Sequence, residues 1–184
     1  MIILGIDPGT RITGYGVVKC INNNFIRVAG GSINLPANEP IPQRLEIIYS
    51  EISKIIKKYN PDEFAIETAF YGKNVQSTLK LGHARGVSIL AAVNKQIPTT
   101  EYSPREVKKS VSGLGAASKE QVRFMVCRIL NLNIKTLPKQ TDISDAIAVA
   151  LCHHNKLLGG GSRENKGKSW EAYIKENPKK VKVR

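Results

Sequence analysis

The chain has 184 residues, of which 41% are hydrophobic and 23% charged, enough for one compact domain with its own core. Its three cysteines are far apart, and no apolar run reaches the roughly 18 residues that a membrane-spanning helix needs. These features argue against a disulfide framework, a zinc finger and a membrane protein. Because the N-terminus also lacks the pattern of a signal peptide, we expect a reducing cytoplasmic setting.

The charge balance points to a class of partner. Lys and Arg number 28 against 15 Asp and Glu, a net charge of +13. The segment from Ser162 to Arg184 holds eight basic and three acidic residues, and the part before it is strongly basic as well. This distribution favours a polyanion such as nucleic acid, although a solvated basic surface without a specific partner would give the same count.

The N-terminal part of the chain is predicted to form three antiparallel strands and then a helix. Apolar, β-branched stretches predict strands over Met1–Asp7, Gly14–Cys20 and Phe25–Leu35, with an Asn-rich hairpin loop before the last one. The apolar residues then recur at helical spacing over Pro42–Tyr59, and the Asn-Pro pair that follows ends this helix.

The middle of the chain contains a short strand and a long helix. Glu63–Glu67 is predicted to be a buried strand parallel to the first one. The helix spans about Asn74–Lys95 and contains Gly82 and Gly86. Because a glycine inside a helix costs roughly 1 kcal/mol, two of them four residues apart suggest the close approach of another helix.

The C-terminal part adds one strand and three helices. A strand is predicted over Pro98–Tyr102, and helices over Pro104–Val111, Ser118–Leu130 and Thr141–Leu157. The result is an α/β chain with a mixed five-stranded sheet flanked by helices, an order that fits a ribonuclease-H-like domain. A dinucleotide-binding fold fits less well, because Gly14-Tyr15-Gly16 leads into a strand and not into a helix. We expect this domain over residues 1–158 and a basic, flexible tail over residues 159–184.

Acidic residues stand where the elements of this predicted sheet end. Asp7 closes the first strand and Glu67 closes the fourth. Asp142 and Asp145 lie three residues apart at the start of the last helix, a spacing that places both on one face. Taken singly, each has a structural explanation: Asp7 as the first residue of a β-turn, Asp142 as a helix N-cap with Asp145 in the first turn, and Glu67 as a solvated strand end.

The four acids together indicate a metal site. Converging carboxylates form an oxygen-rich site that suits hard divalent cations, Mg²⁺ or Mn²⁺. Two such cations clamp a scissile phosphate, one activating the attacking water and the other stabilising the leaving 3′-oxygen. Neighbouring like charges should raise the pKa of the carboxyl groups until metal binds, so activity should fade at low pH.

At these residues the chain resembles the RuvC family of Holliday-junction resolvases. The matching stretches run in family order and at family spacing over nearly the whole chain up to Leu157. They are Ile-Leu-Gly-Ile-Asp-Pro-Gly-Thr-Arg from residue 3, Ala-Ile-Glu from 65, Lys-Leu-Gly-His-Ala-Arg-Gly from 80, Val-Lys-Lys-Ser-Val-Ser-Gly-Leu-Gly from 107 and Asp-Ile-Ser-Asp-Ala from 142. The tail, with Trp170, lies outside the resemblance.

The resemblance implies an activity and a set of residue roles. It implies a homodimer that nicks two opposed strands of a four-way junction symmetrically, leaves ligatable 5′-phosphates, and works with the branch-migration proteins RuvA and RuvB. The residues that correspond to the family's functional positions are the catalytic acids Asp7, Glu67, Asp142 and Asp145, the active-site lysines Lys108 and Lys119, the junction-contacting Phe70, and a dimer-forming helix bearing Gly82 and Gly86.

Alternatives remain open for several of these residues. Phe70 and Tyr71, with Lys73 close behind, could stack on an unpaired base and bind DNA, but Phe70 could equally be a core residue. Lys108 and Lys119 could be ordinary solvated lysines. The run from Cys152 to His154 suggests a metal site only weakly, since adjacent helical residues point in different directions, and a terminal polar cluster is the simpler interpretation.

Three rival functions fit the sequence less well than a resolvase. A sugar-kinase or actin-type ATPase would need a second homologous domain, for which 184 residues leave no room. The shorter, monomeric RuvC-like nucleases are disfavoured by the long glycine-bearing helix. A non-catalytic DNA-binding module is disfavoured because all four acids are present.

Overall fold

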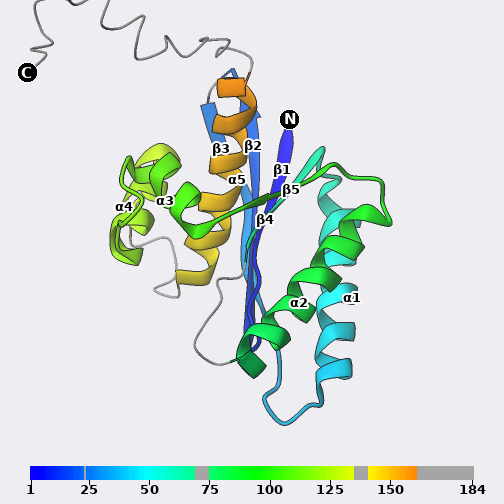
Figure 1. The fold of residues 1–184 in the computed structure, drawn as a ribbon. Helices are drawn as coiled ribbons and strands as arrows, with labels where there is room; N and C mark the ends of the chain where they lie inside the picture. The colour runs from blue at the N-terminus through cyan, green and yellow to red at the C-terminus, as the bar shows by residue number, and fades with distance from the viewer. Residues whose placement is uncertain (23, 69–74, 135–140, 161–184) are drawn as a thin grey trace, which may run out of the picture.

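The computed structural model describes residues 1–22, 24–68, 75–134 and 141–160 (Figure 1). Within these ranges five strands form one mixed sheet in the order β3-β2-β1-β4-β5. The strands are β1 (Ile2–Asp7), β2 (Ile12–Ile21), β3 (Asn24–Asn34), β4 (Glu63–Glu67) and β5 (Thr99–Tyr102). Strands β1, β2 and β3 pair in antiparallel fashion, and β4 lies parallel to both β1 and β5, which confirms the predicted mixed sheet.

Helices cover both faces of this sheet. They are α1 (Ile41–Tyr59), α2 (Val75–Val93), α3 (Pro104–Ser112), α4 (Lys119–Ile129) and α5 (Thr141–Gly160). Figure 1 shows α1 and α2 on one face and α5 on the other, with α3 and α4 beyond it. The predicted end of the last helix at Leu157 was too early, because α5 continues through Gly159 and Gly160. Glycine lowers helix stability without forbidding the helix.

Short-range capping explains why several helices begin and end where they do. Ser103 and Ser118 cap α3 and α4, each in a reciprocal capping box with the residue three positions on, Glu106 and Gln121. Helix α1 ends at Asn60, which takes a left-handed conformation with φ 44° and donates its backbone N–H to the carbonyl of Ile56.

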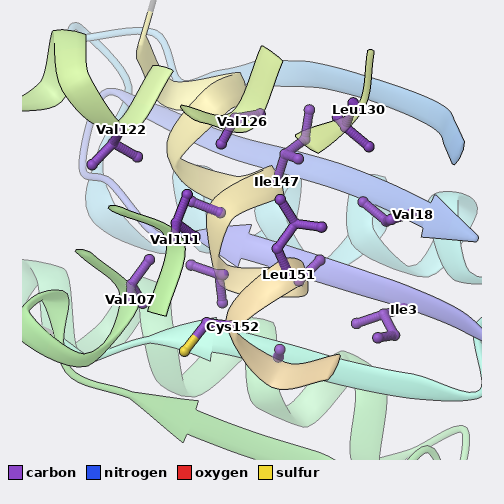
Figure 2. Packing of buried hydrophobic residues seen from close by; sticks show 14 of the residues in the cluster. Ile3, Val18, Val107, Val111, Val122, Val126, Leu130, Ile147, Leu151 and Cys152 are labelled. Carbon is purple, nitrogen blue, oxygen red and sulfur yellow. The ribbon is translucent and has the colours of Figure 1, made fainter. Parts of the chain in front are cut away.

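The hydrophobic core has two layers, one on each side of the sheet. Alternate residues of β1 enter different layers: Ile3 packs on the α5 side, whereas Leu4 and Ile6 pack on the α1 side. On the α5 side, Ile147 and Leu151 lie between the sheet and the apolar faces of α3 and α4, as Figure 2 shows. Helix α5 is therefore buried between the sheet and a second layer of helices, which fixes the position of its first turn.

Among the described residues, every helix is too short or too polar to cross a bilayer.

Candidate active site

Two acidic side chains meet where β1 and β4 end. These strands are parallel neighbours with Ile6 opposite Ile66, so the next residues, Asp7 and Glu67, lie side by side at the same edge. Side chains alternate along a strand, and Ile3 and Ala65 both face α5. Asp7 and Glu67, four and two residues further on, therefore face α5 as well.

The first turn of α5 adds the other two acids. Asp142 is partly exposed, and the Asp145 side chain is only 13% exposed. The charges of both residues act on Asp7, and the charge of Asp145 also acts on Glu67, so the four carboxyl groups form one electrostatic cluster. The structure thus brings together the four acids that the sequence singled out.

Burial and mutual repulsion make the cluster unfavourable as a set of free anions. Burial, followed by the negative charge of Glu67 and Asp145, raises the pKa of Asp7 to about 8. Burial, followed by the charge of Asp145, raises the pKa of Glu67 to about 7. The pKa of Asp145 is also raised, again mainly by burial. The upward shift expected from neighbouring like charges is present for all three groups, but desolvation by burial is the larger cause.

Two lysines bring positive charge to the cluster. The Lys119 ammonium donates a hydrogen bond to Oδ2 of Asp145 at 3.0 Å. Burial lowers the pKa of Lys119, but the bond to Asp145 and the negative charge of Asp7 and Asp142 outweigh it, so that the pKa is raised overall. Lys108, on α3, acts through its charge and lowers the pKa of Glu67 and Asp145. Neither lysine is simply a solvated surface residue.

The remaining predicted site residues form two groups. Phe70, Tyr71 and Lys73 fall outside the described residues. Gly82 and Gly86 lie on α2, across the sheet from α5, and a Cβ added to either one would meet no atom within 4 Å. Nothing in the described chain packs against these two positions, so the helix expected beside them is not one of the described helices.

The interpretation of Cys152, His153 and His154 as a terminal polar cluster was wrong. Both histidines are buried, His153 against Tyr102 at 2.8 Å and near Glu63 at 3.3 Å, and His154 edge-on to the ring of Phe25. The two rings point in different directions, as expected. Nor does this run form a metal centre: within the described part of the chain, no group of three or more His, Cys, Asp or Glu side chains is closed around a point that could hold a metal ion.

A groove beside Lys108 was not predicted. It has a volume of about 770 Å³ and is lined by Pro104, Arg105, Lys108, Leu114, Gly115, Ala116, Ala117 and Gln121. Arg105, which lines this groove, was not among the residues singled out from the sequence. Its spacing of three from Lys108 on one helix was the available signal, because that spacing places both cations on the same face.

Comparisons with known proteins identify the family. The sequence model described as "Crossover junction endodeoxyribonuclease RuvC" matches residues 3–153. The chain belongs to the RuvC family. It is 46% identical over 182 residues to the RuvC of Cytophaga hutchinsonii, covering 99% of this chain and 88% of that one. It is 51% identical over 160 residues to the RuvC of Photobacterium profundum, covering 85% of this chain and 90% of that one.

Solved structures agree with this assignment. Thermus thermophilus RuvC in complex with a Holliday junction substrate superposes with a TM-score of 0.80 at 30% identity, covering 87% of this chain and 96% of that one. The yeast mitochondrial Holliday junction resolvase superposes with a TM-score of 0.64 at 16% identity, which is a likeness of fold alone. The ribonuclease-H-like fold predicted from the order of elements is confirmed, and the RuvC family is a family of nucleases.

Proposed function

We propose that this chain is a structure-selective endodeoxyribonuclease that resolves Holliday junctions with divalent cations held by Asp7, Glu67, Asp142 and Asp145. The observation that carries the proposal is the meeting of two strand-end acids with the first turn of α5, in a place where burial raises the pKa of Asp7 to about 8. Membership of the RuvC family and the likeness to a RuvC bound to a junction support the substrate.

The donor set fits a hard divalent cation. All four groups are carboxylates, the ligands that Mg²⁺ and Mn²⁺ prefer over those that select zinc or copper. The pKa values of Asp7 and Glu67 are raised, as expected for buried carboxyl groups without a metal cation to stabilise their ionised form. Because these side chains are not closed around one point, we infer that the ligands move together when a cation binds, and that Asp145 then exchanges part of its contact with Lys119.

The chain's own residues would divide the work of phosphodiester hydrolysis. Two bound cations supply Lewis-acid chemistry by activating water and neutralising charge at the scissile phosphate. The four carboxylates hold and orient them. Lys119, the first residue of α4, and Lys108, on α3, bring positive charge to the cluster, which would stabilise the extra negative charge of the transition state. Arg105, beside Lys108 in the groove, would bind the DNA backbone next to the cut.

Further elements of the proposal follow from the family. Phe70 and Tyr71, with Lys73, would stack on and bind the unpaired strand close to Glu67. The exposed face of α2, with Gly82, Gly86 and the exposed apolar side chains Leu79, Leu90 and Val93, would join two copies of the chain. A dimer has two active sites related by symmetry, so it would make paired nicks in opposed strands and leave 5′-phosphates, in cooperation with RuvA and RuvB.

The decisive experiment uses a synthetic four-way junction. The protein should nick the junction in Mg²⁺ and should leave a linear duplex with the same arm sequences largely intact. Asp7→Asn removes one carboxylate charge with little change in shape, so it should abolish nicking while junction binding in metal-free buffer survives. Mg²⁺-dependent nicking by this variant at near wild-type rate would remove Asp7 from the site. Equal cutting of junction and duplex by the wild type would refute structure selectivity.

A further inference from the structure

One glycine touches both halves of the acid cluster. Gly14, on β2, is the cross-strand partner of Asp7 on β1. It also faces the first turn of α5. A Cβ built on Gly14 would overlap the carbonyl oxygen of Asp142 and would stand 2.7 Å from its carbonyl carbon and 3.1 Å from its Cβ, so all three nearest atoms belong to Asp142. The backbone of β2 therefore supports the turn that carries two of the four acids.

This contact differs from ordinary tight packing because the two nearest atoms are backbone atoms. A flexible side chain can rotate away from an added methyl group, whereas a helical carbonyl moves only if its whole turn moves. The first turn of α5 would have to rise off the sheet, and Asp142 and Asp145 would rise with it. Asp7 would stay, because β1 is held by strands on both sides.

We propose that Gly14 is a positioning residue of the catalytic centre, setting the separation between Asp7 on the sheet and the Asp142–Asp145 turn of α5. This inference rests on the proposed function, because it takes these acids to be the metal ligands. Gly5 and Gly16 make similar close contacts with the α5 backbone, but their contacts are with Ala146, Ala150 and Ile147, whereas those of Gly14 are with Asp142. Gly14 touches no reacting atom and acts through Asp142.

A matched control lies on the next strand. Gly30, on β3, also lies under the first turn of α5, but a Cβ added there would meet chiefly the Cγ2 methyl of Ile143, at 2.9 Å. That methyl is a side-chain atom of Ile143 and not part of the backbone of the turn. Gly30→Ala therefore adds the same group beneath the same turn without pressing on the backbone that carries Asp142.

The test measures metal binding directly. Titration with Mn²⁺ alone, followed by calorimetry, should show Gly14→Ala weakened about 10–100-fold, the range found when the support of a metal ligand is removed. Gly30→Ala should stay within about threefold of wild type. Both variants should bind a four-way junction in metal-free buffer within about threefold of wild type. Equal Mn²⁺ affinities of Gly14→Ala and wild type would overturn the proposal, as would loss of the native circular dichroism spectrum, which would make Gly14 a folding residue.

A rescue experiment separates positioning from general damage. Asp142→Glu alone makes this ligand one methylene too long and should weaken Mn²⁺ binding. In Gly14→Ala, where the turn has moved outward, the longer side chain should reach back and recover part of the affinity. A double variant no better than Gly14→Ala would contradict the positioning role, because damage unrelated to distance gives a longer carboxylate no advantage.

The failure of this inference is distinguishable from the failure of the proposed function. If wild-type protein neither binds Mn²⁺ at this cluster nor nicks a junction, the proposed function is wrong. If wild type does both and Gly14→Ala matches it, only the positioning role is wrong.

Discussion

The ammonium group of Lys119 lies 3.0 Å from Oδ2 of Asp145, so a protein cation already contacts one of the carboxylates that we propose as metal ligands. The two residues come from different helices, α4 and α5, and the Lys119 side chain is 58% exposed whereas that of Asp145 is 13% exposed. The lysine therefore reaches from the solvent side into the cluster, which is where a DNA phosphate would approach.

Removing this positive charge should alter the pH dependence of cleavage. Lys119 lowers the pKa of Asp7, Glu67 and Asp145. In Lys119→Gln these pKa values should rise further, so the acidic limb of the pH–rate profile should move to higher pH. The rate at neutral pH should fall about 10²–10³-fold, the usual effect of removing a group that stabilises transition-state charge.

The control for this prediction is Lys109→Gln, which removes an exposed lysine from α3. It should leave the acidic limb in place. Junction binding by both variants in metal-free buffer should remain within about tenfold of wild type, because each removes one phosphate-binding charge at most. An acidic limb that Lys119→Gln leaves unmoved would show that the ion pair does not govern the ionisation of the cluster.

A second prediction concerns the stability of the metal-free protein. The pKa of Asp7 is raised from 3.8 to about 8, so the folded state binds a proton that the unfolded state releases between these values. The free energy of unfolding should therefore fall as pH rises from about 4 to about 8. Asp7→Asn carries a neutral side chain at position 7 at every pH and lacks the Asp7 part of this fall, whereas Glu67 and Asp145, whose pKa values are also raised, keep theirs. It should be more stable than wild type by at least about 2 kcal/mol at pH 9, with the difference shrinking toward pH 5.

Urea unfolding in chelating buffer at several pH values measures this difference. In saturating Mg²⁺ at pH 8 the wild type should instead be more stable than Asp7→Asn. The cation stabilises the ionised carboxylates of the wild type, and Asp7→Asn has one ligand fewer. A difference that does not change with pH would mean that Asp7 is ionised in the folded protein without metal, against the burial of its side chain.

Much of the site was predictable because its acidic residues lie at the ends of strands and in the first turn of a helix. Two buried parallel strands ending in acids, Asp7 and Glu67, must place them at one edge, and the i, i+3 spacing of Asp142 and Asp145 places them on one helix face. Element boundaries were close for a similar reason: capping serines and the Asn-Pro stop are local signals. The roles of these residues in catalysis stay predictions.

The remaining features of the site could not be predicted, because they depend on contacts between residues that are far apart in the sequence. Nothing in the sequence around Gly14 reveals that its missing side chain leaves room for the carbonyl of Asp142, 128 positions away. The burial of His153 and His154 was missed because the apolar surroundings come from Phe25 and Tyr102, on strands β3 and β5. The dominance of desolvation in the pKa of Asp7 likewise depends on burial in the folded chain, which no local pattern reveals.

A third prediction tests the dimer through α2. A Cβ at Gly86 would meet no atom of the described residues within 4 Å, so Gly86→Phe should leave the folded subunit intact. If a second copy packs closely against this face, the added ring should raise the dimer dissociation constant at least about tenfold, since overpacking costs about 1–3 kcal/mol. Sedimentation over a range of concentrations measures this constant. Lys57→Phe, on an exposed position of α1, adds a ring elsewhere and should not change it.

Wild-type protein that sediments as a monomer at micromolar concentration would overturn both the interface and the paired-nick mechanism. A dimer that tolerates Gly86→Phe would move the interface away from this face of α2.

The last prediction concerns the basic segment at the C-terminus, which lies outside the described residues. Residues 162–184 hold eight basic and three acidic side chains, a net +5 of the total +13. A lysine-rich segment of this kind binds phosphates without reading bases. Truncation after Gly161 should therefore weaken binding to junction and plain duplex by similar factors. It should also flatten the dependence of log affinity on log salt by about 0.9 for each phosphate that the segment neutralises.

Cleavage by the truncated protein at saturating concentration should change little, because the proposed catalytic residues end at Asp145. The competing view is that Trp170 and Tyr173 dock the segment on the body or on a partner protein. Truncation would then alter stability or partner recruitment and leave the salt slope alone. Measuring the slope with and without the segment separates the two views, and an unchanged slope would defeat the electrostatic interpretation.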